Sequence, residues 1–310
     1  MFQIYERIPG GMQAITNSLR LGPKCLSVVN RTLCLIPALN TSTSYLFHFP
    51  ELCLTSGVRN YAHGGHWDYN DHGEHGPRTW PNADGHCQSP VNIDLGNVTW
   101  SENFEPLNFS HYSQLLSGEI VNNGHSVQVN PKFGNNVPQV SGGGFDQSYQ
   151  LVQYHFHWSQ LDHEGAEHTI GGLHYPMELH LVHIGVKDSS KIAVIGVYLL
   201  PGERGAALKA EEPLISRIRA PSSSETISGV NLMEKLPKNL KSFWRYSGSL
   251  TTPPCSEIVT WTIFTEPVNI TRDQLHLFRQ ICDRPRHKLE KNFRPVLKLY
   301  GREVKQVRTQ

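Results

Sequence analysis

The stretch "YHFHW" at 154–158 places two imidazoles two residues apart inside a run of bulky apolar side chains. Successive side chains of a β-strand point to opposite faces. A strand over 149–158 therefore has one face with Leu151, Gln153, His155 and His157, and an opposite face with Val152, Tyr154, Phe156 and Trp158. Burying a polar ring costs free energy unless the ring finds a partner. The first face must therefore meet a ligand, a hydrogen-bonding network or solvent, while the aromatic face meets a core.

A second predicted strand, 177–186, adds a third imidazole, because its two-residue period puts Glu178 and His180 on one face. If the two strands are neighbours, the three imidazoles converge. Three neutral imidazoles that leave one coordination position open are typical of a catalytic zinc site. Gln153 and Glu178 each precede a proposed ligand by two residues, so they are candidates to hydrogen-bond its second nitrogen. Spacing alone leaves solvated histidines on a sheet surface as an equal alternative.

The rest of the chain from Tyr61 onward predicts a mainly β domain with a few short helices. Short runs rich in Val, Ile, Phe and Tyr alternate with Gly, Pro, Asn and Asp. Besides the two strands above, we expect strands at 118–130, 191–200 and 257–265 and helices at 211–219 and 271–281. The last helix opens with a capping-box pattern, a threonine followed three residues later by glutamine. We expect one domain over 61–310, preceded by an N-terminal extension or leader, 1–60, to which we assign no structure.

Nine short motifs identify a family. They are "HWDY" (66–69), "QSPVNI" (88–93), "NNGHSVQV" (122–129), "QYHFHW" (153–158), "AEHT" (166–169), "ELHLVH" (178–183), "GSLTTPPC" (248–255), "VTWTIF" (259–264) and "NFRP" (292–295). In this order they closely resemble the α-class carbonic anhydrases over essentially all of 61–310. The resemblance implies a single domain around a large twisted, mainly antiparallel β-sheet. It also implies a bound zinc ion and the reversible hydration of carbon dioxide to bicarbonate and a proton, by attack of zinc-bound hydroxide.

The resemblance implies a role for individual residues. The zinc ligands are His155, His157 and His180, whose hydrogen-bond partners are Gln153, Glu178 and the Asn292 carbonyl. Thr251 matches the residue that accepts a hydrogen bond from the hydroxide, and Glu167 the carboxylate that receives the threonine proton. The apolar substrate pocket comprises Val182, Val194, Leu250, Thr252, Val259 and Trp261. His125 matches the proton shuttle, with Tyr69, Asn123 and Gln128 in the polar shell that carries the water chain.

The resemblance implies a small-molecule substrate, carbon dioxide or bicarbonate, and the charge balance indicates no macromolecular partner. Lys plus Arg number 28 and Asp plus Glu 27, so the net charge of +1 gives no reason to expect nucleic acid or an anionic membrane surface. No run reaches the roughly 18 apolar residues of a spanning helix. Composition does not indicate an oligomeric state.

Two cysteines indicate a compartment. Cys87 and Cys255 match the paired cysteines of secreted and membrane-bound family members, and closing that loop would remove roughly 5 kcal/mol of unfolded-chain entropy. Disulfides persist in oxidising compartments, so we expect an extracellular glycoprotein. Sequons occur at Asn30, Asn40, Asn97, Asn108 and Asn269. Because 1–60 shows no clear signal peptide, organelle targeting or a cytoplasmic location is the alternative.

Two rival functions remain at this stage. One is a carbonic-anhydrase-like binding module without turnover, although such modules usually lack a ligand histidine and this chain has all three. The other is an unrelated zinc hydrolase, although no His-Glu-x-x-His motif occurs. The ten residues between His183 and Val194, where many family members have about twenty, predict a more open cleft on that side.

Overall fold

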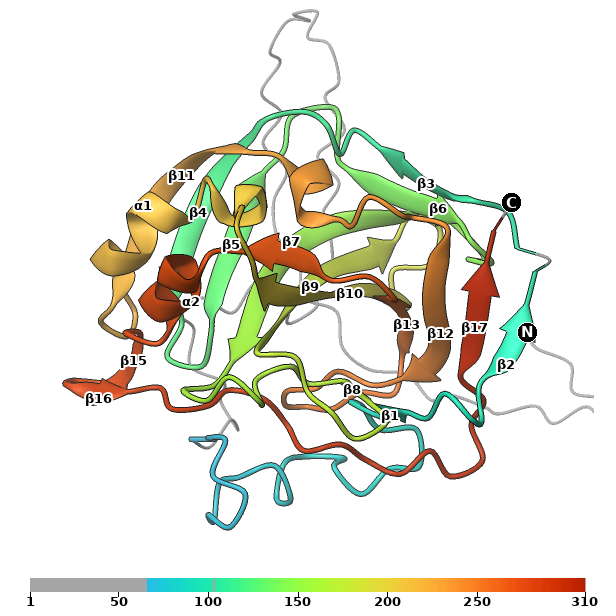
Figure 1. Ribbon diagram of the computed structural model, residues 1–310, viewed down its shortest axis with the longest axis horizontal. Helices are drawn as coiled ribbons and strands as arrows, with labels where there is room; N and C mark the ends of the chain where they lie inside the picture. The colour runs from blue at the N-terminus through green and yellow to red at the C-terminus, as the bar shows by residue number, and fades with distance from the viewer. Residues whose placement is uncertain (1–65, 103, 310) are drawn as a thin grey trace, which may run out of the picture. The chain divides into compact units, whose positions relative to one another are not determined.

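The computed structural model describes residues 66–102 and 104–309. The predicted extension 1–60 and the first five residues of the predicted domain, 61–65, therefore lie outside the described residues. A 13-stranded sheet organises the described part (Figure 1). Its path in space is β11 (Ser224–Val230), β4 (Leu116–Asn122), β5 (Val127–Lys132), β7 (Tyr149–Trp158), β9 (Met177–Gly185), β10 (Ile192–Pro201), β13 (Val259–Phe264), β12 (Ser242–Gly248), β17 (Lys305–Arg308) and β2 (Thr99–Ser101).

The remaining elements attach to this path or lie beside it. The strands are β1 (Asn92–Ile93), β3 (Leu107–Ser110), β6 (Gln139–Gly142), β8 (Thr169–Ile170), β14 (Val268–Ile270), β15 (Cys282–Arg284) and β16 (His287–Lys288). The helices are α1 (Glu212–Ile215), α2 (Arg272–Phe278) and the 3-10 turns η1 (Ala206–Leu208), η2 (Ser216–Ile218) and η3 (Leu232–Lys235). Most neighbours in the large sheet are antiparallel, but β10 pairs with β13 and β14, and β17 with β2, in parallel. The predicted fold class is confirmed.

The predicted capping box forms at the start of α2. Thr271 Oγ1 accepts from the Gln274 backbone N–H (3.0 Å), and Gln274 Oε1 accepts from the Thr271 N–H (2.9 Å). These bonds satisfy two backbone donors that no helical carbonyl reaches. The helix then buries Leu275 and Phe278 in the larger hydrophobic core, which the aromatic face of β7 also joins.

The expected single strand over 118–130 is wrong, because the segment is a hairpin of β4 and β5. The Asn123 side-chain oxygen accepts from the backbone N–H groups of His125 (2.9 Å) and Ser126 (2.7 Å). Such side-chain to backbone bonds replace the strand ladder at a turn. His125 is therefore a turn residue at the end of the sheet that carries β7.

Leu151 does not share a strand face with Gln153, His155 and His157, so this part of the prediction is wrong. A β-bulge between Leu151 and Gln153 shifts the register, so Leu151 lies opposite His183 while Gln153 lies opposite Val182. An extra residue in one strand turns the side chains that follow it to the other face. Leu151 is accordingly buried in the larger core with Tyr154 and the other aromatic residues of β7.

The two faces of the sheet are covered by different cores. The helices and the aromatic face of β7 form the larger core. The opposite face carries a smaller core that includes Val182, Val194 and Trp261, and on this face lie the three imidazoles. No helix among the described residues has the length and apolarity needed to span a bilayer.

Candidate active site

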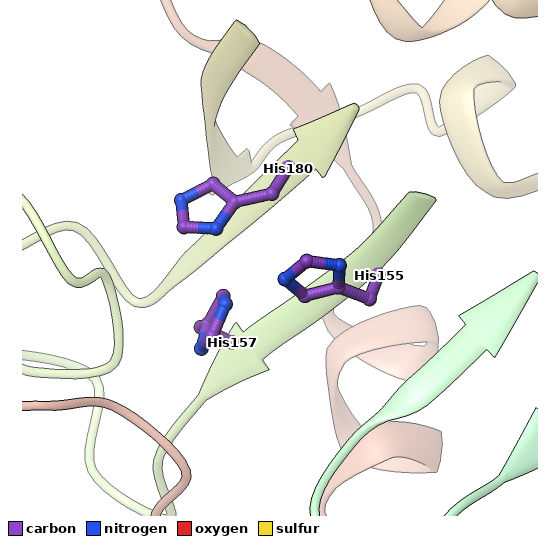
Figure 2. Close-up of side chains that lie close together, drawn as sticks. All are labelled: His155, His157 and His180. Atoms are coloured by element: carbon purple, nitrogen blue, oxygen red, sulfur yellow. The ribbon is translucent and has the colours of Figure 1, made fainter. Parts of the chain in front are cut away.

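Three imidazoles from two adjacent strands face one another (Figure 2). His155 on β7 lies directly opposite His180 on β9, and His157 follows two residues further along β7. The ring centroids are 5.0 Å apart for His155 and His157, 5.3 Å for His155 and His180, and 4.5 Å for His157 and His180. One nitrogen from each ring lies within 4.8 Å of the others. The strand period and the register thus bring these side chains to one point.

Each ring has a different acceptor on its second nitrogen. Gln153 Oε1 lies 2.9 Å from His155 Nδ1, and the Asn292 carbonyl oxygen lies 2.7 Å from His157 Nδ1. Glu178 Oε1 lies 2.8 Å from His180 Nε2. Because these acceptors take the ring protons, the lone pairs are left on Nε2 of His155 and His157 and on Nδ1 of His180.

These lone pairs fit a metal ion. His157 is fully buried and its Nε2 atom has no hydrogen-bond partner among the described residues. Burial lowers the pKa of His155 well below its usual range and that of His157 to about 3, so both rings are neutral. A buried polar atom without a partner is costly, and three neutral imidazoles with one open vertex suit catalytic zinc.

His168, in the motif "AEHT", is a buried residue for which the sequence predicted no role. Its Nδ1 lies 2.8 Å from Glu178 Oε1, and its Nε2 lies 2.7 Å from the Tyr246 hydroxyl. His168, Glu178 and His180 could also be taken for a metal-binding group. Their atoms are instead explained by hydrogen bonds, since Glu178 Oε1 accepts from both imidazoles. The signal that could have found His168 is its place beside Glu167 in a buried motif.

A hydroxyl and a carboxylate lie near the imidazoles. Glu167 is fully buried, and its Oε1 accepts from the Arg294 backbone N–H at 2.9 Å. Burial raises the pKa of Glu167 to about 7, whereas His180, the Thr251 hydroxyl and the Arg294 backbone N–H act to lower it. Its Oε2 has no hydrogen-bond partner among the described residues, so in the ionised form this oxygen is free to accept from a hydroxyl.

The predicted apolar pocket lies beside His180. Val194 on β10 is opposite Val182 on β9 on one side and Trp261 on β13 on the other. All three are buried, and the Trp261 ring lies 4.8 Å from that of His180. Val259 is buried in the same core and Leu250 packs against it, whereas Thr252 is half-buried in the following turn. The wall next to the imidazoles is therefore dry and apolar.

The loop after β12 is tied to this wall. Trp261 Nε1 donates to the Ser249 carbonyl at 3.0 Å, and the Leu250 N–H donates to the Ser256 carbonyl at 3.0 Å. These bonds hold Thr251 in a buried position between them. Its place is thus set by the sheet and not by a free loop.

His125 stacks on Trp67, with ring centroids 3.7 Å apart. Burial, followed by the neighbouring His66, lowers the pKa of His125 to about 4. The ring is therefore neutral at pH 7 and can accept a proton. Asn123 Nδ2 donates to Gln128 Oε1 at 3.4 Å, and Gln128 is the register partner of His155.

Tyr69, the third residue expected in the polar shell, is buried in an aromatic cluster. Its ring meets those of Trp67 and Trp80 edge to face, with centroids 5.4 and 5.6 Å away. Burial, and then the charge of Glu167, raises the pKa of the Tyr69 phenol well above its usual range. The hydroxyl is therefore protonated at all physiological pH values.

Comparisons with known proteins show the family of the chain. The model of the family described as "Eukaryotic-type carbonic anhydrase" matches residues 73–308. The chain belongs to this carbonic anhydrase family. It is 54% identical over 240 residues to "Putative carbonic anhydrase 3" of Caenorhabditis elegans. The aligned region covers 77% of this chain and 97% of that relative. It is 36% identical over 257 residues to human "Carbonic anhydrase 7", covering 78% and 97% of the two chains.

Membership of the carbonic anhydrase family confirms the predicted enzyme class. The chain is an enzyme that hydrates carbon dioxide. The histidine group found by geometry agrees with the zinc dependence of the family. The rival interpretation as an unrelated zinc hydrolase is thereby set aside.

The disulfide expected from the secreted carbonic anhydrases is not formed in the structure, where Cys87, Cys255 and Cys282 are free thiols. Cys255 is buried against Tyr69 and Trp80, and this burial raises the pKa of its thiol to about 11. Cys87 lines a surface cavity instead. The two thiols thus lie in different surroundings.

Proposed function

We propose that His155, His157 and His180 hold a zinc ion through the nitrogen atoms that their other contacts leave free. Zinc held by three neutral ligands is a Lewis acid that ionises water near neutral pH, a property for which carbonic anhydrases are the standard example. Gln153, Glu178 and the Asn292 carbonyl fix the tautomers of the three rings. The observation that carries the proposal is the buried Nε2 of His157, which has no partner among the described residues.

Thr251 and Glu167 orient the nucleophile. In its ionised form the carboxylate accepts a hydrogen bond from the Thr251 hydroxyl, so the hydroxyl oxygen is left to accept a hydrogen bond from the attacking group. Positive charge at the centre favours the ionised form of Glu167 and so maintains this direction. The effect is one of orientation, because the pair places a lone pair toward the carbon atom without adding reactivity of its own.

The apolar wall receives carbon dioxide. Val182, Val194 and Trp261 offer a buried surface with no group that competes with the three imidazoles for the metal. Leu250 and Val259 extend it toward the loop that carries Thr251. A linear apolar molecule gains by leaving water for such a surface, whereas charged bicarbonate is poorly held there and leaves.

His125 carries the proton away from the centre. Its ring stacks on Trp67 and is neutral at pH 7, and a neutral imidazole has a nitrogen lone pair that can take up a proton and pass it to solvent or buffer. The side chains of Asn123 and Gln128 lie between the turn and β7. They provide polar groups to which bridging water can bind.

Stopped-flow measurement of carbon dioxide hydration tests the proposal. A zinc chelator should abolish activity, and added zinc should restore it. His157→Ala should lose activity and metal together. His174→Ala is the matched control, because His174 Nδ1 bonds the Ala166 carbonyl (2.7 Å) outside the cluster. Chelator-resistant turnover, or equal activity in both variants, would contradict the metal assignment.

Extracellular localisation and glycosylation stay predictions. The sequons in the described part, at Asn97, Asn108 and Asn269, are exposed. A mobility shift after deglycosylation of the natively produced protein would support the prediction. A thiol count under denaturing conditions would show whether the native protein differs from the structure in the state of Cys87 and Cys255.

A further inference from the structure

A surface cavity of about 740 Å³ is lined by residues of β12, of β13 and of the segment before β17. Part of its lining is Phe145 from the segment before β7, Tyr149 at the start of β7 and Lys191 from the turn before β10. None of the three imidazoles lines it. The cavity is therefore separate from the candidate metal centre, although it reaches Val259 at the back of the substrate pocket.

Arg245 of β12 lines this cavity and is itself only 7% exposed. Its Nε donates to Thr262 Oγ1 at 3.1 Å, and its guanidinium carbon lies 4.1 Å from the centre of the Phe145 ring. Nη2 is buried without a hydrogen-bond partner, and no carboxylate of residues 66–102 or 104–309 forms an ion pair with this group. Arg245 is thus a buried cation with no counter-ion in that range.

This state is costly unless something supplies an anion. A buried charge is normally paired, and an uncompensated one is strongly destabilising. Burial lowers the pKa of Arg245 to about 10, which leaves the guanidinium charged at neutral pH. Packing against Phe145 offsets part of the cost, but Nη2 still has no hydrogen-bond acceptor among the described residues.

The other charged side chains that line the cavity already form ion pairs or hydrogen bonds. Asp146 pairs with Lys191 at 2.6 Å, and Glu303 with Lys305 at 3.7 Å. The lining also holds two further charged side chains. Glu257 Oε1 accepts from the Cys87 N–H (2.7 Å) and from Gln88 Nε2 (2.9 Å), and Arg302 donates to the carbonyls of Leu299, Ser247, Gln88 and Lys298. No group of the lining is therefore placed to neutralise Arg245.

We propose that this cavity binds a small planar oxyanion, a monocarboxylate or the bicarbonate that the enzyme produces, on the Nη edge of Arg245. A carboxylate-like group matches the parallel N–H bonds that a guanidinium presents. Phe145 packs against the guanidinium from one side. Because Nη2 is buried, only a small anion can enter beside it. No residue of the proposed mechanism except Val259 lines the cavity, so a failure of this proposal leaves that mechanism standing.

Nuclear magnetic resonance on the ¹⁵N-labelled, zinc-loaded enzyme tests the site directly. Sodium formate and sodium bicarbonate are titrated separately at constant ionic strength, with chloride as a spherical reference anion. We expect saturable shifts of the Arg245 Nε–H signal and of the backbone amides of Ser247 and Thr262 at millimolar anion. Saturation by both anions indicates general planar-oxyanion binding, and saturation by bicarbonate alone identifies the product as ligand. No saturable shift with either anion would overturn the proposal.

Variants of Arg245 and Lys305 test whether the anion binds through the Arg245 guanidinium or responds only to the positive charge of the cavity. Arg245→Met should weaken the anion response of the two amides at least roughly tenfold. Lys305→Met removes an exposed cation of the same cavity that is paired with Glu303, and it should retain the wild-type affinity. If the first variant does not fold, Arg245→Lys keeps the charge but not the fork and should bind less tightly than wild type. Equal binding by wild type and every folded Arg245 variant would refute the assignment.

Discussion

Replacing Glu178 by glutamine should weaken zinc binding without removing any metal ligand. Glu178 Oε1 lies 2.8 Å from both His168 Nδ1 and His180 Nε2, and Oε2 accepts from the His168 backbone N–H at 2.9 Å. Glutamine has one carbonyl oxygen in place of two acceptors. Whichever way the amide turns, at least one N–H faces another donor, and at a fully buried position water cannot take over the bond.

The size of the effect follows from the role of this carboxylate. Loss of a partner that orients a metal-binding histidine typically costs 10- to 100-fold in metal affinity. At about 1.4 kcal/mol for each factor of ten, the loss is roughly 1.4–2.8 kcal/mol. Burial acts to raise the pKa of Glu178, yet His168 and His180 lower it well below its usual range. The native side chain is therefore an anion, and Glu178→Gln also removes a charge next to His180.

Competition with a chromophoric chelator measures the zinc dissociation constant of both proteins. Glu211→Gln is the matched control, because Glu211 is equally buried and accepts from Tyr154 and Lys235 on the other side of the sheet. It should lower the free energy of unfolding but leave zinc affinity within about twofold of wild type. The reasoning is refuted if Glu178→Gln binds zinc as tightly as wild type, or if both variants lose affinity equally.

Two further predictions concern histidines outside the metal centre. His125→Ala should slow turnover on the order of 100-fold in dilute buffer, because proton transfer then lacks its acceptor. Added imidazole should restore the rate. If stopped-flow assays show no such rescue, His125 is not the proton shuttle. Burial lowers the pKa of His183 to about 4 in the folded protein. Between about pH 6.5 and 4 the unfolded chain therefore binds more protons at this residue than the folded protein does. The free energy of unfolding falls as the pH falls through that window. His183→Gln, which can keep the bonds to Tyr112 and the Ala193 carbonyl, should flatten this decline in urea unfolding, whereas an unchanged slope would contradict the pKa.

The sequence predicted the strands of the site well because their pattern is strictly local. The expected strand 149–158 has the bounds of β7, and the expected strand 177–186 differs from β9 by one residue. Alternation alone therefore placed His155, His157 and His180 on the correct faces. Pairing of the two strands needed the resemblance, because no local pattern reports which strand lies beside which.

Other features depended on tertiary context. The bulge that turns Leu151 into the larger core follows from register with β9, which apolar periodicity does not encode. The hairpin turn at His125 depends on the backbone N–H groups that donate to the Asn123 side chain. His168 was missed because its role comes from Glu178 and Tyr246, which are distant in sequence. Pairing of Cys87 with Cys255 came from the resemblance alone and stays a prediction, because both residues are free thiols in the structure.

Metal analysis of the purified, zinc-loaded protein tests the central claim most directly. Elemental analysis should find one zinc ion per chain, and X-ray absorption should show three histidine nitrogen donors at about 2.0–2.1 Å. The His157→Ala variant should lose this signature. A protein that binds no zinc, or one whose zinc has sulfur ligands or keeps its coordination in that variant, would contradict the account.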